Sequence, residues 1–214
     1  MSQGARTHLA DDLVRVHRAI TRGLTVAQER GAHFVNHGFP DLISRQGYLD
    51  YGRCLLAILR GHHDAEDTVI FPRLLMVPGV PFRRLHAEHQ RLAALLDAAD
   101  GAIEAAAVAR FVRLLAEVED LWQVHIASEE QHLTAEAIDR SLSPFDQSAI
   151  ASAIAEHAMR TVKPEYLALP FFLYNLDRED RAIIAHKLSP VVFNELVPGA
   201  WKEKWAPMKP FFLD

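Results

Sequence analysis

The chain has 214 residues, half of them apolar, which is enough to bury the core of one domain or of one domain with an appendage. Its formal net charge is −5, and the Lys and Arg residues are scattered among acidic residues rather than gathered in one stripe. This charge pattern argues against a nucleic-acid-binding protein, which would need a basic surface.

The first twelve residues contain no apolar run of signal-peptide length, and no stretch of the chain is long and apolar enough to span a bilayer. The single cysteine, Cys54, excludes an intrachain disulfide and a zinc site built from cysteine pairs. We therefore expect a cytoplasmic protein with no membrane partner. Histidine is unusually frequent, with 12 copies.

Four segments carry apolar residues three and four positions apart, the spacing that predicts amphipathic helices. The first runs from about Thr7, a candidate N-cap, to Arg30. The second runs from about Leu42 to Ile70, and we expect Phe71-Pro72 to end it because proline cannot continue the hydrogen-bond ladder. The third follows the loop "VPGVP", and the fourth covers about 103–140. Four such helices with short connections predict an all-α fold, an up-down-up-down four-helix bundle.

The segment after the fourth predicted helix differs in composition. Ser143 and Pro144 predict a helix start, with serine as the N-cap and proline at the first helical position, and this helix should end near Val162. A shorter helix is expected over about 177–187. Large apolar groups are frequent in "LPFFLYNL" and in the final "WKEKWAPMKPFFLD".

We therefore divide the chain into a bundle, residues 1–140, and a helical, aromatic-rich C-terminal extension, residues 141–214. Exposed apolar groups are unfavourable in water, so the extension should pack against the bundle or against a second subunit of a homodimer.

Two of the predicted helices carry a histidine and a glutamate four positions apart on their apolar faces. Residues with this spacing lie about 40° apart around a helix and one turn along it, so His62 and Glu66 should project together from the face that holds Leu59. His125 and Glu129 repeat this arrangement in the fourth helix. By contrast, His63 and Asp67 continue the line of the charged Arg60, so we expect them to form a solvated pair at the rim.

The first and third predicted helices also direct histidines inward. In an antiparallel bundle, the starts of these two helices lie at the same end as the ends of the second and fourth. All the inward histidines and glutamates can therefore meet at one level. The candidate metal ligands are His17, His62, Glu66, His86, His89, His125 and Glu129.

A single inward histidine is usually a satisfied core residue. Seven such groups are different, because each would cost on the order of several kcal/mol to bury unpaired. They are too many for one metal and suit two metals about 3.5 to 4 Å apart, bridged by Glu66 and Glu129. Imidazole with carboxylate suits iron, zinc or manganese.

The pattern of one motif per helix resembles the hemerythrin or HHE cation-binding domain family over about residues 8–140. The motifs that carry the resemblance are "H" at 17, "HxxxE" at 62–66 followed by "FP", "EH" at 88–89 and "HxxxE" at 125–129. The resemblance implies a four-helix bundle holding two non-haem iron ions with an oxo or hydroxo bridge. It also implies two bridging carboxylates, Glu66 and Glu129, and terminal imidazole ligands from His17, His62, His89 and His125.

His86 departs from the spacing of the oxygen-carrying members, because it lies three residues before His89 and their two histidines are four apart. It is still on the inner face, and whether it ligates is left open. If it does, one iron has three imidazoles, as in a carrier. If it does not, a second exchangeable position becomes available.

Three functions suit such a centre. The first is binding of O₂ or a similar small diatomic ligand such as NO. The second is an enzyme, either decomposing peroxide in a catalase-like way or acting as an oxidase. The third is a sensor or an iron-handling protein that works through partners. The shortened spacing at His86 leads us to expect peroxide or related redox chemistry, with the others as alternatives.

Overall fold

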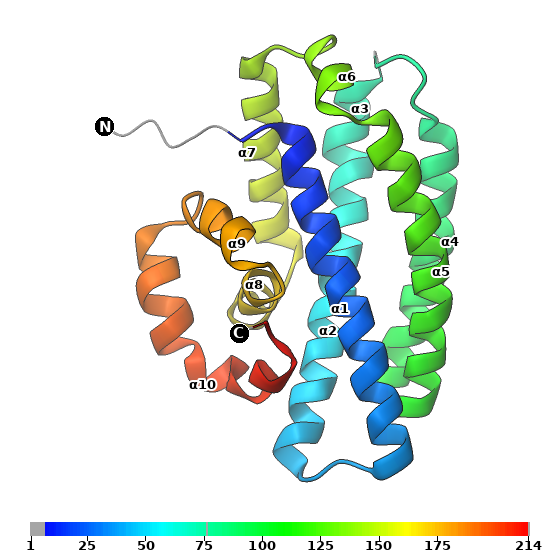
Figure 1. Cartoon of the computed structure of the whole chain (residues 1–214), viewed down its shortest axis with the longest axis vertical. Coiled ribbons are helices and arrows are strands. Elements are labelled where there is room, and N and C mark those ends of the chain that lie inside the picture. The colour runs from blue at the N-terminus through cyan, green and yellow to red at the C-terminus, as the bar shows by residue number, and fades with distance from the viewer. Residues whose placement is uncertain (1–6, 76, 214) are drawn as a thin grey trace.

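A computed structural model of the chain describes residues 7–75 and 77–213, and this part of the chain contains helices and no β-strand. Four long helices form the bundle: α1 (Leu9–His37), α2 (Leu42–Ala65), α4 (Phe82–Glu104) and α5 (Val108–His132) (Figure 1). Each of them packs against the next along the chain, and α5 also packs against α1, which closes the ring. The all-α prediction is confirmed.

We had predicted that the second helix ends at Phe71-Pro72, but the chain stays helical to Leu74. It passes from α2 through a π-helical turn, η1 (Glu66–Ile70), into a short helix, α3 (Phe71–Leu74). Pro72 directly follows the π-helical turn, so its missing N–H group falls where the hydrogen-bond pattern changes from one helix type to the next. The chain therefore continues for one more turn before the loop to α4.

Other helix ends also differ from the predicted ones. The N-cap of α1 is His8 rather than Thr7, and α1 continues to His37, where Gly38 ends it with a positive φ of 76°. The fourth helix begins at Val108 because 103–104 still belong to α4 and Ala106 turns the chain with a φ of 51°. After α5 the chain bends into a separate short helix, α6 (Ala135–Asp139).

The C-terminal extension wraps one side of the bundle (Figure 1). It begins with α7 (Pro144–Thr161), whose N-cap Ser143 forms a capping box with Asp146, and the predicted helix start is confirmed. The remaining helices of the extension are α8 (Glu165–Tyr174), α9 (Arg178–Ala185), η2 (Val192–Ala200), α10 (Lys202–Trp205) and η3 (Ala206–Phe211).

The extension covers the outer side of α2, which contacts α7, α8 and η3. The Tyr51 ring packs against Phe171 with centroids 4.6 Å apart, and its hydroxyl donates to Asn175 Oδ1 at 2.6 Å. At Gly47 a Cβ atom would come within 2.0 Å of the Pro207 carbonyl oxygen, so only glycine allows this approach of η3. Helix α2 is thus enclosed by the bundle on one side and by the extension on the other. The division into two domains at residue 140, and a homodimer through the extension, stay predictions.

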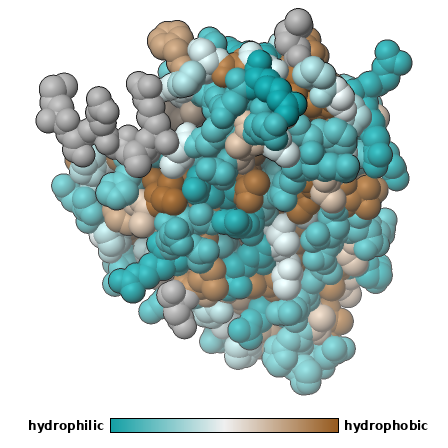
Figure 2. Space-filling model, turned by 45° about the horizontal axis from the view of Figure 1, so that its top comes forward, coloured by the Kyte–Doolittle hydropathy of each residue, from teal (hydrophilic) through white to brown (hydrophobic). Residues whose placement is uncertain are grey.

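The face of the molecule in Figure 2 is mostly hydrophilic, with hydrophobic residues in small separate areas. Within the described ranges, no helix combines the length and apolar character that crossing a membrane requires.

Candidate metal centre

Two groups of buried histidines and glutamates meet inside the bundle, and both include Glu66. In each group, the candidate ligand atoms all lie within 4.8 Å of one another. We call them the three-imidazole set, which consists of His63, Glu66, His89 and His125, and the two-imidazole set, which consists of His17, His62, Glu66 and Glu129.

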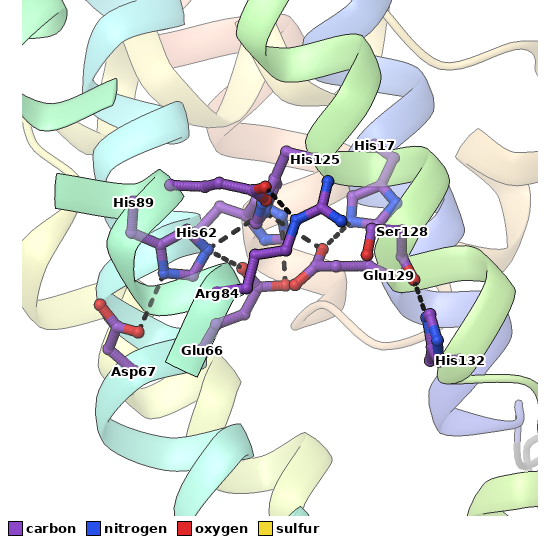
Figure 3. Close-up of polar contacts among 11 residues, drawn as sticks. His17, His62, Glu66, Asp67, Arg84, His89, His125, Ser128, Glu129 and His132 are labelled. Atoms are coloured by element: carbon purple, nitrogen blue, oxygen red, sulfur yellow. Dashed lines mark hydrogen bonds and ion pairs between the residues drawn. The ribbon is translucent and has the colours of Figure 1, made fainter. Parts of the chain in front are cut away.

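The two glutamates connect the sets. Glu66 Oε1 lies 3.3 Å from His62 Nε2, and Glu66 Oε2 lies 3.4 Å from His89 Nε2. Glu129 Oε2 lies 3.3 Å from His17 Nε2 and 3.4 Å from His125 Nε2. Figure 3 shows the rings of His17, His62, His89 and His125 gathered around these carboxylates from different helices. Each carboxylate therefore touches one imidazole of each set, the position that a bridging ligand would occupy.

The residues present fit a pair of metal ions. All seven side chains are buried, with no more than 8% of any residue exposed. Most of their inward atoms have no hydrogen-bond partner: Nε2 of His17, His62 and His63, and both carboxylate oxygens of Glu66 and Glu129. Leaving these polar atoms buried and unpaired is costly, and metal coordination satisfies them together.

Outer carboxylates hold three of the imidazoles by their other nitrogen atom. His17 Nδ1 lies 2.9 Å from Glu130, His89 Nδ1 lies 2.9 Å from Asp67, and His125 Nδ1 lies 3.2 Å from Glu88. A carboxylate at Nδ1 fixes the orientation of the ring and leaves Nε2 free for a metal. Sequence reasoning had placed Asp67 in a solvated pair with His63, and it had not assigned this orienting contact to Glu130.

His63 is the main correction to the predicted site. We expected it at the rim in a solvated pair with Asp67, but it is buried, 6% exposed, and belongs to the three-imidazole set. On a helical wheel Glu66 lies about 40° from His62 and about 60° from His63, so the carboxylate falls between the two rings. This angle was available in the sequence, and Arg60 on the same line misled the prediction.

His86 belongs to neither set. Its side chain is 54% exposed, and its Nδ1 atom lies 3.1 Å from Asp67 Oδ1 at the edge of the site. One residue less in the spacing to His89 rotates the side chain by about 100° around α4, which turns it outward. The other six predicted residues do lie together. His63 contributes the additional imidazole that was expected from His86.

Aromatic rings enclose the cluster. Trp122, fully buried on α5, has its ring centroid 5.5 Å from that of His17 and 5.8 Å from that of His62. The Phe71 ring stacks on His89, with centroids 5.5 Å apart and planes 13° apart. These rings exclude water from the surroundings of the imidazoles, which strengthens the electrostatic interactions inside.

The electrostatics of the metal-free cluster are strongly perturbed. Burial alone would lower the pKa of His17 and His89, but the neighbouring carboxylates outweigh it and raise each pKa to about 9. Burial, followed by repulsion from Glu129, raises the pKa of Glu66 to about 8. Burial, followed by nearby imidazoles, lowers the pKa of His62 and His63 well below the ordinary value.

These shifts predict how the stability of the metal-free protein depends on pH. Above about pH 6.5 the folded chain binds more protons than the unfolded chain at His17, His89 and Glu66, so the free energy of unfolding should fall as the pH rises to about 9. Thermal unfolding of chelator-treated protein at pH 6.5 and pH 9 measures this. A melting temperature that rises over this range would contradict the assigned proton distribution.

Two hollows border the cluster on the side of His17, between α1 and α5. The first has a volume of about 180 Å³ and is lined by His17, Glu129 and Glu130 among others. The second, about 490 Å³, is lined by His17 and Glu130 and extends along α1 through Arg18 and Arg22. The two-imidazole set is therefore the one that lies beside space open to small molecules.

The family model of the hemerythrin HHE cation binding domain matches residues 8–137 of the chain. This range contains the four long helices and every residue of both sets. No curated protein and no solved structure matched the chain.

Proposed function

Because the chain belongs to the hemerythrin HHE cation-binding family, we propose that it holds two non-haem iron ions, one in each set. The three-imidazole set offers His63, His89 and His125 to one ion, and the two-imidazole set offers His17 and His62 to the other. Glu66 and Glu129 serve both ions. Imidazole with carboxylate is a donor set that iron accepts, and the absence of thiolate donors in both sets is consistent with it.

We further propose that the protein binds a small ligand, O₂ or NO, reversibly. The observation that carries this is the unequal number of imidazoles, three against two. Iron in such a centre supplies reversible redox chemistry toward small oxygen-containing ligands. The set with fewer imidazoles is the one with room for an exchangeable ligand, and it borders the two hollows through His17. His63 supplies the third imidazole that we had sought from His86, which removes our reason for preferring peroxide chemistry.

The chain's own residues prepare this site in three ways. Trp122 and Phe71 exclude water from the imidazoles. Glu130 accepts a hydrogen bond from His17 Nδ1, which keeps Nε2 of that ring directed inward. The hollows beside His17 give a diatomic molecule a route to the two-imidazole set.

The test is an absorption spectrum of the reduced, iron-loaded protein under argon, under O₂ and again after removal of O₂ under vacuum. We expect a new band under O₂ that disappears under vacuum and returns on re-exposure. The matched variant is His17→Ala, which removes one of the two imidazoles and should abolish the band. A wild-type spectrum that does not change under O₂ or NO would contradict reversible ligand binding.

Peroxide decomposition is the second candidate, and one observation favours it. Glu130 is 41% exposed, lines both hollows and contacts His17, so a group able to exchange protons with solvent stands beside the site. Release of O₂ over many turnovers after addition of hydrogen peroxide, reduced in the variant Glu130→Gln, would select this function over carriage.

A further inference from the structure

Two arginines line the larger hollow, and an uncharged diatomic ligand has no need of either. It lies along α1 and is lined by Arg18 and Arg22, by Thr21 and by the apolar side chains of Val14 and Ile126. Its volume of about 490 Å³, open to solvent on one side, far exceeds the needs of a diatomic ligand.

Arg22 is the informative residue in this hollow. Arg15 and Arg18, two helical turns and one helical turn before it, both pair with Asp180 of α9, at 3.0 Å and 2.8 Å. The Arg22 Nε atom, in contrast, is buried and has no hydrogen-bond partner among the described residues. Because this nitrogen is shielded from solvent, an anion in the hollow pairs with the outer Nη groups of Arg22, on a guanidinium that the protein leaves unsatisfied at Nε.

Other groups at the same place can complete the recognition of an anion. Thr21 Oγ1 accepts a hydrogen bond from Trp122 Nε1 at 2.9 Å, which leaves the hydroxyl hydrogen of Thr21 available to a ligand. Arg18 uses Nη1 for Asp180, so its remaining N–H groups are available as well. The opposing charge in the hollow is Glu130, whose carboxylate is already engaged by His17 Nδ1.

From these contacts we infer a binding site for a small organic carboxylate in the hollow between α1 and α5, next to the two-imidazole set. Arg22 and Arg18 bind the carboxylate, Thr21 donates to it, and Val14 and Ile126 contact the apolar body of the ligand. A guanidinium matches a carboxylate with two parallel hydrogen bonds, and the apolar walls favour an organic acid over a bare inorganic anion. This site goes beyond binding of a diatomic ligand at the metals and does not depend on it.

Benzoate is a suitable probe because it joins a carboxylate to a compact apolar ring. Titration calorimetry of the full-length, iron-loaded protein with benzoate should give saturable binding. The variant Arg22→Gln should bind benzoate at least about tenfold more weakly, which corresponds to the loss of one charge-assisted hydrogen bond. Thr21→Val should weaken binding to a smaller extent, because it removes one neutral donor.

The control is Arg110→Gln, which makes the same change of charge at an exposed arginine on α5 outside the hollow. It should leave the affinity unchanged, and iron content measured for each variant shows that the metal centre is intact. No heat of binding in the wild-type protein would overturn the inference. Equal affinities of wild type and Arg22→Gln would also overturn it, since benzoate would then be bound elsewhere, for instance at the metals.

Discussion

Replacing Glu66 with Ala should reduce the iron content of the purified protein from two ions per chain to about none. Glu66 lies in both sets and contacts one imidazole in each, so its loss removes a ligand from both ions at once. Removal of a ligand that two ions share should weaken the binding of both ions. Metal analysis of protein expressed in iron-replete medium measures the result. One ion retained at full occupancy would show that Glu66 is not shared.

Two histidine variants provide the controls for this experiment. His86→Ala should keep both ions, because His86 is exposed and lies outside both sets. His63→Ala should lose at least the ion of the three-imidazole set, because His63 is buried within it. Full iron content in His63→Ala together with loss in His86→Ala would return the ligand assignment to the one that the sequence first suggested.

A chain that ends at Arg140 should fail to accumulate as a soluble folded protein. The extension covers the outer side of α2, where Tyr51 and Leu55 are fully buried against it and against the bundle. Removing the extension exposes this apolar face to water, and a large exposed apolar patch promotes aggregation. The measurement is the soluble yield and the unfolding transition of the truncated chain. A truncated protein that is soluble, cooperatively folded and fully loaded with metal would contradict this prediction.

A single substitution tests the same contact in the full-length chain. Phe171 of α8 is completely buried against Tyr51, so Phe171→Ala should lower the free energy of unfolding by about 3–5 kcal/mol. Phe145 of α7 is 79% exposed, so Phe145→Ala should change it by no more than about 0.5 kcal/mol. Urea unfolding of both variants gives the comparison. Equal effects would mean that the extension contributes little to stability.

The spacing of apolar residues was sufficient to predict the long helices and six of the seven buried ligand candidates. This succeeded because a helix facing a bundle core has a regular period, and His62 with Glu66 follows that period. The helix ends were predicted less well. The end of α1 at Gly38 and the turn at Ala106 depend on local backbone conformation, which the period of the side chains does not encode.

His63 was missed because sequence reasoning assigned one buried stripe to each helix. Helix α2 has more than one buried line, because α1, α4 and the extension all pack against it. The line of His63 faces the bundle interior, where its ring stacks on His89 of α4 with centroids 4.2 Å apart and lies 5.3 Å from the ring of His125 of α5. Leu56, on the same line, is only 1% exposed. The charged Arg60 on this line therefore does not mark it as a line that faces solvent.

The π-helical turn at Glu66–Ile70 leads directly to Phe71, whose ring stacks on His89 and covers that face of the three-imidazole set. His17, in the two-imidazole set, instead forms part of the wall of both hollows. A molecule arriving from solvent through the hollows therefore reaches the two-imidazole set at His17 first.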